Sequence, residues 1–186
     1  MAEHVCPWWV GYFLASPLRR LSQNPEKILS PYVKPGMTVI DVGCAMGFFS
    51  LPLARLVGSD GRVVCVDVQK KMIDSLRRRA NRAGHAKNMD LRVCEKSSLG
   101  LDDLAGKIDF VLAFAVAHEI PDVPGLMTQM HAMLAPDGRC LLAAEPSGHV
   151  NARDFEKTVA AAQQAGLTIV ERPEIRRSRA VLLARG

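Results

Sequence analysis

The feature of this sequence that most constrains its fold is a short apolar run that ends in a glycine-rich turn. The run covers Met37–Val42 and continues as Gly43-Cys44-Ala45-Met46-Gly47, after which apolar residues recur at helical spacing over Phe48–Val57. Glycines between a strand and a helix let the backbone approach a ligand closely and leave the first N–H groups of the helix available to it. The pattern predicts a strand–turn–helix unit of an α/β domain.

The same alternation of strand and helix patterns continues along the chain. Further elements are predicted as strands over Arg62–Val66, Leu91–Cys94, Ile108–Phe114 and Arg139–Ala144, helices over Gln69–Ala83 and Val123–Leu134, and a turn at Pro136–Gly138. Asn151 is predicted to cap a last helix that ends at Gly166. Five strand–helix alternations imply right-handed crossovers and a parallel sheet with helices on both faces.

The end of the chain breaks this pattern. Two last strands are predicted over Leu167–Val170 and Ala180–Leu183. The segment between them is too short for a crossover helix, which takes about a dozen residues. The last strand must therefore turn back as a hairpin, so we predict a Rossmann-like α/β fold whose mostly parallel sheet ends in one antiparallel strand.

Length and composition set the domain organisation. The chain has 186 residues, of which 48% are hydrophobic and 23% charged, and this suits one globular domain and excludes a disordered chain. Its longest clearly apolar runs, Trp8–Ala15 and Phe110–Ala117, are well short of the roughly 20 residues of a membrane-spanning helix, and no secretory signal is evident. The five cysteines are odd in number and widely spaced, which favours reduced thiols in a cytoplasmic protein.

An acidic residue and the glycine-rich turn together form a pattern typical of nucleoside-binding sites. Asp67 ends the second predicted strand and follows Gly47 by 20 residues. A carboxylate at that place can accept two hydrogen bonds from ribose hydroxyls. A nicotinamide-dependent dehydrogenase would instead carry G-x-G-x-x-G near the start of its domain. Here the spacing is G-x-x-x-G, and about 36 residues precede the strand.

These residues resemble the class I S-adenosylmethionine-dependent methyltransferases. The resemblance rests on Asp41-x-Gly43-x-x-x-Gly47, on Asp67, on Asp109 at the start of the fourth strand, and on the closing hairpin. It covers residues 25–184 and is greatest to the small-molecule methyltransferases of ubiquinone and menaquinone biosynthesis. It implies a seven-stranded sheet, S-adenosyl-L-methionine as cofactor and S-adenosyl-L-homocysteine as product.

The resemblance also assigns the cofactor site. It implies that Gly43 and Gly47 line the methionine part, that Asp67 holds the ribose, and that Asp41 supports the turn and the amino-acid end. Four further residues are assigned to the site: Cys44, Ala45, Val68 and Phe114. The family usually has glycine at Ala45, and it often has an acidic residue for the adenine where this chain has Lys96. Lysine cannot accept a hydrogen bond, so Ser97 or a backbone carbonyl is expected to take that role.

Candidate residues for the methyl acceptor follow the fourth and fifth strands. His118 is the candidate catalytic base, because histidine titrates near neutral pH, and Glu119 beside it is the second candidate. The alternative is that both only cap the loop or form ion pairs. His149, after the fifth strand, is a candidate substrate-binding residue, unless that loop is purely structural. Neither an Asp/Asp/Asn triad for Mg²⁺ nor the Asn-Pro-Pro-aromatic run of many base-amine methyltransferases is present.

The first 24 residues form a separate aromatic-rich segment before the domain at residues 25–186. It contains Trp8, Trp9 and Tyr12, which are candidate substrate-binding residues of a lid over the acceptor. The alternatives are that this segment packs on the core or that it contacts a second copy of the chain in a homodimer.

The net charge of +5 permits an anionic partner without requiring one. Basic residues gather within residues 70–82 and 172–179. No aromatic interleaving accompanies them, so nucleic acid is not the expected partner. The sequence predicts an enzyme that methylates a small molecule. The alternatives are an RNA methyltransferase and a regulatory domain that binds the cofactor without turnover.

Overall fold

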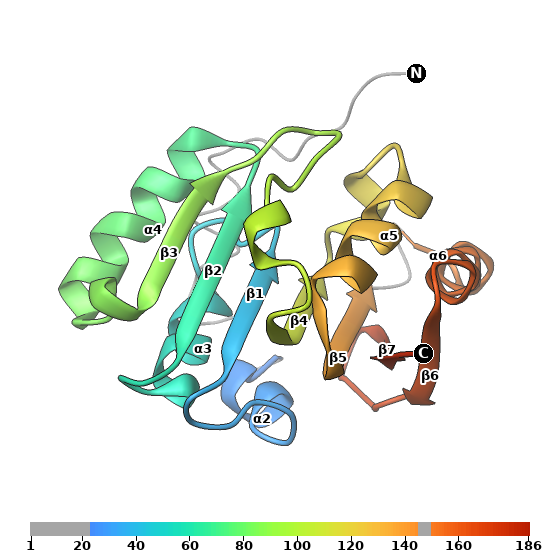
Figure 1. Ribbon diagram of the computed structural model, residues 1–186, viewed down its shortest axis with the longest axis horizontal. Coiled ribbons are helices and arrows are strands. Elements are labelled where there is room, and N and C mark those ends of the chain that lie inside the picture. Colours follow the sequence, from blue (N-terminus) through green and yellow to red (C-terminus); the bar gives the residue numbers. More distant parts are fainter. Residues whose placement is uncertain (1–22, 145–149) are drawn as a thin grey trace.

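A computed structural model describes residues 23–144 and 150–186, which form a seven-stranded sheet between two layers of helices (Figure 1). The order of the strands in the sheet is β3-β2-β1-β4-β5-β7-β6. In chain order the strands are β1 (Thr38–Val42), β2 (Arg62–Asp67), β3 (Met89–Val93), β4 (Ile108–Phe114), β5 (Leu134–Ala144), β6 (Leu167–Glu171) and β7 (Arg179–Arg185). The seven-stranded Rossmann-like sheet predicted from the sequence is confirmed.

Within the described residues, five α-helices cover the two faces of this sheet. They are α2 (Pro25–Leu29), α3 (Ser50–Val57), α4 (Lys70–Ala83), α5 (Val123–Met133) and α6 (Ala152–Gln164). The first three bury their apolar side chains in one core with alternate strand residues such as Val39 and Val63. The last two pack on the opposite face, against residues such as Ile40 and Val64. Each central strand is therefore buried on both sides, which explains its continuous apolar sequence.

The pairing of the strands brings five strand ends to one edge of the sheet. Neighbours among β1 to β5 pair in parallel, with Val42 opposite both Val66 and Ala113. β7 runs antiparallel to both β5 and β6, as the short final connection predicts. We call the edge at which β1 to β5 end the carboxyl edge. The start of β7 lies at this edge too, because Arg179 pairs with Ala144.

Three details of the sequence-based prediction are wrong. The connection between β3 and β4 holds only a 3-10 turn, η3 (Asp102–Leu104), so one of the five expected alternations lacks an α-helix. β3 ends at Val93, not at Cys94. The turn expected at Pro136–Gly138 lies within β5, where the pairing with β4 shifts register.

Several polar residues form the local contacts that start these elements. Asn151 caps α6 as predicted, because its side chain accepts a hydrogen bond from the N–H of Asp154 at 2.9 Å. Asp109 accepts a hydrogen bond from the N–H of Thr38 at 2.7 Å and so ties the start of β4 to β1. This contact lies at the edge opposite the carboxyl edge, which makes Asp109 a structural residue.

Two further observations concern the cysteines and the lengths of the helices. The described cysteines are all free thiols: Cys44, Cys65, Cys94 and Cys140. Within residues 23–144 and 150–186, no helix is both long and apolar enough to cross a membrane.

Candidate functional site

The strand order makes the carboxyl edge between β1 and β4 the expected position of a ligand-binding crevice. The order of the strands reverses at this pair, and the helices that follow the two strands, α3 and α5, lie on opposite faces of the sheet. The connections therefore diverge, and open α/β sheets bind their ligands at such a point. The glycine-rich turn leaves β1 here, and the segment with His118 leaves β4 beside it (Figure 1).

The glycine-rich turn has a left-handed backbone at three of its five residues. The φ angles are +69° at Gly43, +45° at Ala45 and +85° at Gly47. A Cβ atom on Gly43 would lie 2.5 Å from Cγ2 of Val116, so its glycine is required by the packing of the β4 loop as well as by φ. The sequence motif by itself indicates only the close approach of a ligand at this glycine. The family pattern usually has glycine at the position of Ala45. The Cβ of Ala45 is therefore held in a sparsely populated left-handed conformation.

Asp67 holds the turn from the neighbouring strand. Its carboxylate accepts hydrogen bonds from the N–H of Ala45 at 3.0 Å and from the N–H of Gln69 at 2.8 Å. The side chain is only 8% exposed, and burial raises its pKa, although both hydrogen bonds act in the opposite direction. A carboxylate has about four acceptor positions, so two are left for a ligand. Hydroxyl groups that donate to them would stabilise the charged form.

A second buried carboxylate lies under the same turn. Asp41 accepts a hydrogen bond from the hydroxyl of Ser50, the first residue of α3, at 2.5 Å. Burial raises the pKa of Asp41 to about 7, and the charge of Asp67 adds to the rise. Two neighbouring carboxylates that have lost their hydration favour a ligand that brings positive charge or hydrogen-bond donors.

Exposed apolar side chains flank Asp67 at the carboxyl edge. Val68 follows it directly and is 37% exposed, and Val93, which pairs with Asp67 across β2 and β3, is 51% exposed. Among the described residues, the only other large apolar side chains this exposed are Ile169 and Val170 on the edge strand β6. The carboxylate is thus bordered by apolar surface that could contact a planar ring.

The segment after β3 carries the residue assigned to the adenine. Ser97 is exposed, and its carbonyl accepts a hydrogen bond from Nε2 of Gln129 on α5 at 3.4 Å. The side-chain oxygen of Gln129 accepts a hydrogen bond from the N–H of Leu99 at 2.8 Å. α5 therefore fixes the backbone of this segment, and the side chain of Ser97 is exposed to solvent.

The residues after β4 lie on the other side of the crevice. Phe114 ends β4 and packs against Phe49 at a ring-centroid distance of 4.5 Å, with only 7% of its surface exposed. Ala115 follows with φ at +58°, a second left-handed non-glycine residue at the carboxyl edge. His118 and Glu119 lie on the 3-10 turn η4 (Ala117–Glu119), and both side chains are exposed.

The structure brings together most of the residues assigned from the sequence. At the carboxyl edge lie Asp41, Gly43, Cys44, Ala45, Gly47, Asp67, Val68, Ser97, Phe114, His118 and Glu119. Cys44 is buried in the core beneath the turn, so a ligand could contact its backbone but not its thiol. Four assigned residues lie outside the described residues: Trp8, Trp9, Tyr12 and His149.

Four supporting residues were not identified from the sequence. Val93, Val116 and Ser50 act through register and packing, which the motif does not encode. Arg79 was counted only as part of the basic segment at residues 70–82, yet its guanidinium donates to the carbonyl of Met46 in the glycine-rich turn. Its place three residues after Leu76, on the apolar side of α4, was the available signal.

Comparison with known proteins identifies the family to which this chain is similar. A family described as "Methyltransferase domain" matches residues 33–172. A nocamycin O-methyltransferase of Saccharothrix syringae is 34% identical over 108 residues, which cover 57% of this chain and 37% of that protein. A ubiquinone biosynthesis O-methyltransferase of Sinorhizobium fredii is 32% identical over 137 residues, which cover 74% of this chain and 51% of that protein. The chain thus spans only about a third to a half of these curated relatives.

The fold also matches solved structures. A SAM-dependent methyltransferase from Aquifex aeolicus superimposes with a TM-score of 0.86 at 22% sequence identity, and the match covers 98% of this chain and 100% of that one. At this identity the match bears on the fold, and it covers nearly the whole chain.

Proposed function

Because this chain belongs to the class I S-adenosylmethionine-dependent methyltransferases, we propose that it transfers a methyl group from S-adenosyl-L-methionine to a small-molecule acceptor. The observation that carries the proposal is the buried carboxylate of Asp67 at the crevice between β1 and β4. It fixes the glycine-rich turn and keeps two acceptor positions for a ligand.

The residues around this carboxylate fit the cofactor. Asp67 would accept from the ribose hydroxyls, and Val68 and Val93 would contact the adenine ring. The positive charge of the methionine part suits the neighbourhood of Asp41 and Asp67, whose burial disfavours two uncompensated negative charges. Ser97 is the proposed partner of the adenine amino group.

Methyl transfer from a sulfonium mainly requires that the protein orient the donor and the acceptor. S-adenosyl-L-methionine supplies an activated methyl group on a sulfonium, so the leaving group needs no proton from the protein. The side chains of the crevice have to hold the acceptor atom in line with that methyl group. We propose that His118 takes the proton of an acceptor hydroxyl or enol, with Glu119 as the second candidate. Both are exposed on η4, which follows the strand at one side of the crevice.

The acceptor is proposed to be small and partly apolar. Trp8, Trp9, Tyr12 and His149 remain the proposed residues that cover it. Removal of residues 1–20 should then leave cofactor affinity within a few-fold while methyl transfer is lost. Loss of both together would assign the segment a structural role. Full activity after truncation would move the acceptor site elsewhere.

Two further properties are proposed. The free thiols of the described cysteines favour a reducing, cytoplasmic environment. A homodimer is the second proposal, and the exposed Ile169 and Val170 on the edge strand β6 offer an apolar surface for it. Sedimentation of the purified chain would test this.

The direct test of function is turnover. The protein is incubated with S-adenosyl-L-methionine and a panel of phenols, enols and acids, and S-adenosyl-L-homocysteine is measured by mass spectrometry. We expect turnover with one acceptor class, reduced in Asp67→Ala at sub-saturating cofactor and retained in Asp90→Ala. Asp90 is a suitable control, because it lies on β3 in ion pairs with Arg62 and Arg92. Binding of the cofactor with no turnover on any acceptor would favour a regulatory domain.

A further inference from the structure

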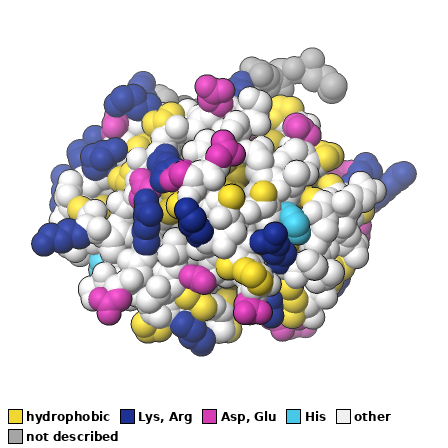
Figure 2. All heavy atoms as spheres, viewed as in Figure 1, with side chains coloured by type: hydrophobic (Ala, Val, Ile, Leu, Met, Phe, Trp, Pro, Cys, Tyr) yellow, Lys and Arg dark blue, Asp and Glu magenta, His cyan; other side chains and the backbone are white. Residues whose placement is uncertain are grey.

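The positive charge of the chain is concentrated in one helix, α4. Of the 24 Lys and Arg residues and the 19 Asp and Glu residues of the chain, six and one lie within its 14 residues. The helix therefore has a net charge of +5, and the rest of the chain is formally neutral. Lys and Arg side chains accordingly gather along the edge of the molecule that α4 forms (Figure 2).

The folded chain uses little of this charge. Lys70 forms an ion pair with Asp74 at 2.7 Å, and Arg79 donates to the carbonyl of Met46 in the glycine-rich turn. Within the part of the chain that the structure describes, three arginines of the helix form no hydrogen bond or ion pair: Arg77, Arg78 and Arg82. Their charge is therefore not part of the proposed cofactor site.

The arrangement of charges is also unfavourable for the helix itself. Lys70 and Lys71 lie in its first turn, where the helix dipole favours acidic side chains, and this turn has no acidic residue. Arg78 and Arg82 are four residues apart, a spacing at which like charges repel each other. An ordinary solvated helix instead mixes the two signs of charge. A pattern that opposes local stability in this way is typical of a functional surface.

The exposed face of α4 carries this charge without a large apolar side chain. Ile73 and Leu76 are buried against the sheet. The exposed residues of the helix are Lys70, Lys71, Arg77, Arg78, Asn81, Arg82 and Ala83. Lys71, Arg78 and Arg82 are seven and four residues apart, so they lie on one stripe of the helix about 16 Å long.

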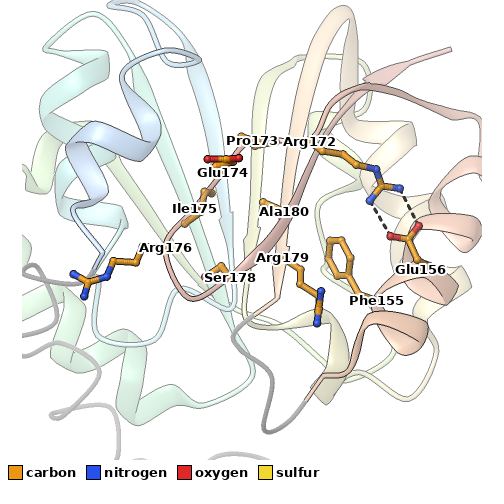
Figure 3. A pocket seen from close by; sticks show the side chains of 10 residues that line it. All are labelled: Phe155, Glu156, Arg172, Pro173, Glu174, Ile175, Arg176, Ser178, Arg179 and Ala180. Atoms are coloured by element: carbon orange, nitrogen blue, oxygen red, sulfur yellow. Dashed lines mark hydrogen bonds and ion pairs between the residues drawn. The ribbon is translucent and has the colours of Figure 1, made fainter.

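The second basic segment of the sequence, residues 172–179, forms no comparable surface. Arg172 binds both carboxylate oxygens of Glu156, at 2.8 and 2.9 Å. Figure 3 shows Arg176 and Arg179 on different sides of the connection between β6 and β7. The cavity of about 550 Å³ beside them is lined by two glutamates as well as three arginines. Charges of both signs therefore meet there, in contrast to the exposed face of α4.

The shape of the α4 face distinguishes between classes of anionic partner. A helix that enters a nucleic-acid groove has to be exposed around most of its circumference, whereas the apolar side of α4 packs on β2 and β3. Single-stranded nucleic acids bind in basic grooves with aromatic side chains, and α4 has no aromatic residue. Protein interfaces bury apolar side chains at their centre, and this face has none of any size. A planar anionic surface requires only a convex basic face.

We propose that the exposed face of α4 binds the anionic headgroups at the surface of a lipid bilayer, through Arg77, Arg78 and Arg82 with Lys71 beside them. Basic residues bind such a surface by charge, without insertion of apolar side chains. Because α4 begins directly after Asp67 and Val68, the carboxyl edge would lie next to the membrane surface. A partly apolar acceptor would be concentrated there. The inference does not depend on the proposed function, and it can be tested without turnover.

The test measures how much of the full chain sediments with lipid vesicles. Vesicles of phosphatidylcholine and phosphatidylglycerol in equal parts should bind the chain at low salt, whereas vesicles of phosphatidylcholine alone should not. Raising the salt to about 1 M should release the chain, because it shortens the range of the attraction to about 3 Å.

Arg77→Gln/Arg78→Gln/Arg82→Gln should weaken binding to the anionic vesicles by on the order of 100-fold, since each basic residue near the surface contributes roughly fivefold. Arg77→Lys/Arg78→Lys/Arg82→Lys should bind as the wild type does, because a bilayer surface attracts either kind of cation. Loss of binding in the lysine variant would contradict the proposal, since it would mean that the geometry of the guanidinium groups is recognised.

The matched control is Arg153→Gln/Arg176→Gln/Arg179→Gln, which removes the same charge from exposed positions on α6 and on the connection between β6 and β7. It should bind the anionic vesicles within a few-fold of the wild type. All three variants should keep the wild-type melting temperature and affinity for S-adenosyl-L-homocysteine, which shows that they are folded.

Two further results would overturn the inference. In the first, the anionic vesicles do not bind the chain at low salt. If a single-stranded RNA then binds and the glutamine variant of α4 loses it, the partner of this face is a nucleic acid. In the second, the control weakens vesicle binding as much as the glutamine variant of α4, so that net charge alone and not this helix is responsible.

Discussion

The carboxylate of Asp67 accepts a hydrogen bond from the backbone N–H of Ala45 at 3.0 Å, so the end of β2 fixes the turn that leaves β1. The two residues are 22 positions apart in sequence. This contact joins the two halves of the motif, the glycine-rich turn and the acidic strand end, into one unit before any ligand binds. A substitution at either residue should therefore affect both the turn and the ligand.

Asp67→Ala should weaken the binding of S-adenosyl-L-homocysteine by roughly 10–100-fold, because hydrogen bonds to a charged group contribute about 1.5–3 kcal/mol each. It should also lower the melting temperature, since the N–H groups of Ala45 and Gln69 lose their acceptor. Calorimetry and thermal melting measure the two effects, with Asp90→Ala as the control. Unchanged affinity in Asp67→Ala would mean that another group holds the ribose.

Gly43→Ala should destabilise the protein more than Gly36→Ala. Both glycines have positive φ, but a Cβ on Gly36 meets open space, whereas one on Gly43 would lie 2.5 Å from Val116. Adding Val116→Ala to Gly43→Ala should restore part of the lost stability, because it removes the Cγ2 contact at 2.5 Å and leaves the Cβ contact at 2.9 Å and the backbone strain. Urea unfolding measures these differences. Equal costs for the two glycine variants would show that Val116 yields without penalty.

The stability of the protein should fall as the pH rises from about 4 to about 7. Burial raises the pKa of Asp41 to about 7, whereas the unfolded side chain ionises near 3.8. Between these values the folded state holds a proton that the unfolded state has released, so the contribution of Asp41 decreases through this range and is constant above it. The rise corresponds to roughly 4 kcal/mol as an upper limit.

Asp41→Asn should flatten this pH dependence and retain a contact with Ser50, whose hydroxyl can donate to the amide oxygen. Some slope should persist, because burial raises the pKa of Asp67 in the same direction. Melting temperatures over this pH range, with the exposed Asp60→Asn as control, provide the measurement. An identical slope in wild type and Asp41→Asn would contradict the assignment.

Arg79→Met should weaken cofactor binding by a few-fold with a smaller effect on folding. Its guanidinium holds the carbonyl of Met46, and its loss frees one side of the glycine-rich turn. Arg78→Met removes the same charge from the exposed side of α4 and should bind S-adenosyl-L-homocysteine as the wild type does. If the two variants weaken binding equally, the effect is one of charge and not of the contact with Met46.

The sequence predicts the fold well because its strongest signals are local. Apolar runs such as Ile108–Phe114 define buried strands, and the short final connection requires a hairpin. The wrong details depend on pairing instead: the turn at Pro136–Gly138 is absorbed into β5 by a register shift against β4. The segment between β3 and β4 is held by Gln129 of α5, a contact between residues about 30 positions apart that no local pattern encodes.

The residues of the candidate site also fall into two groups, those that the local motif identifies and those that depend on contacts between distant segments. The motif identifies Asp41, Gly43 and Asp67, since each stands at a strand end or in the turn that follows one. It does not identify Val93, which lies beside Asp67 only through the register of β2 and β3. Arg79 likewise contacts the turn only because α4 packs beneath it.

Calorimetric titration of the purified chain with S-adenosyl-L-homocysteine tests the central claim most directly, with NADH as the competing nucleotide. We expect saturable binding of one S-adenosyl-L-homocysteine per chain at micromolar concentration, a rise in melting temperature, and no response to NADH. The absence of both heat and thermal shift with S-adenosyl-L-homocysteine, or tighter binding of NADH, would contradict the assignment of Asp67 and the glycine-rich turn to this cofactor.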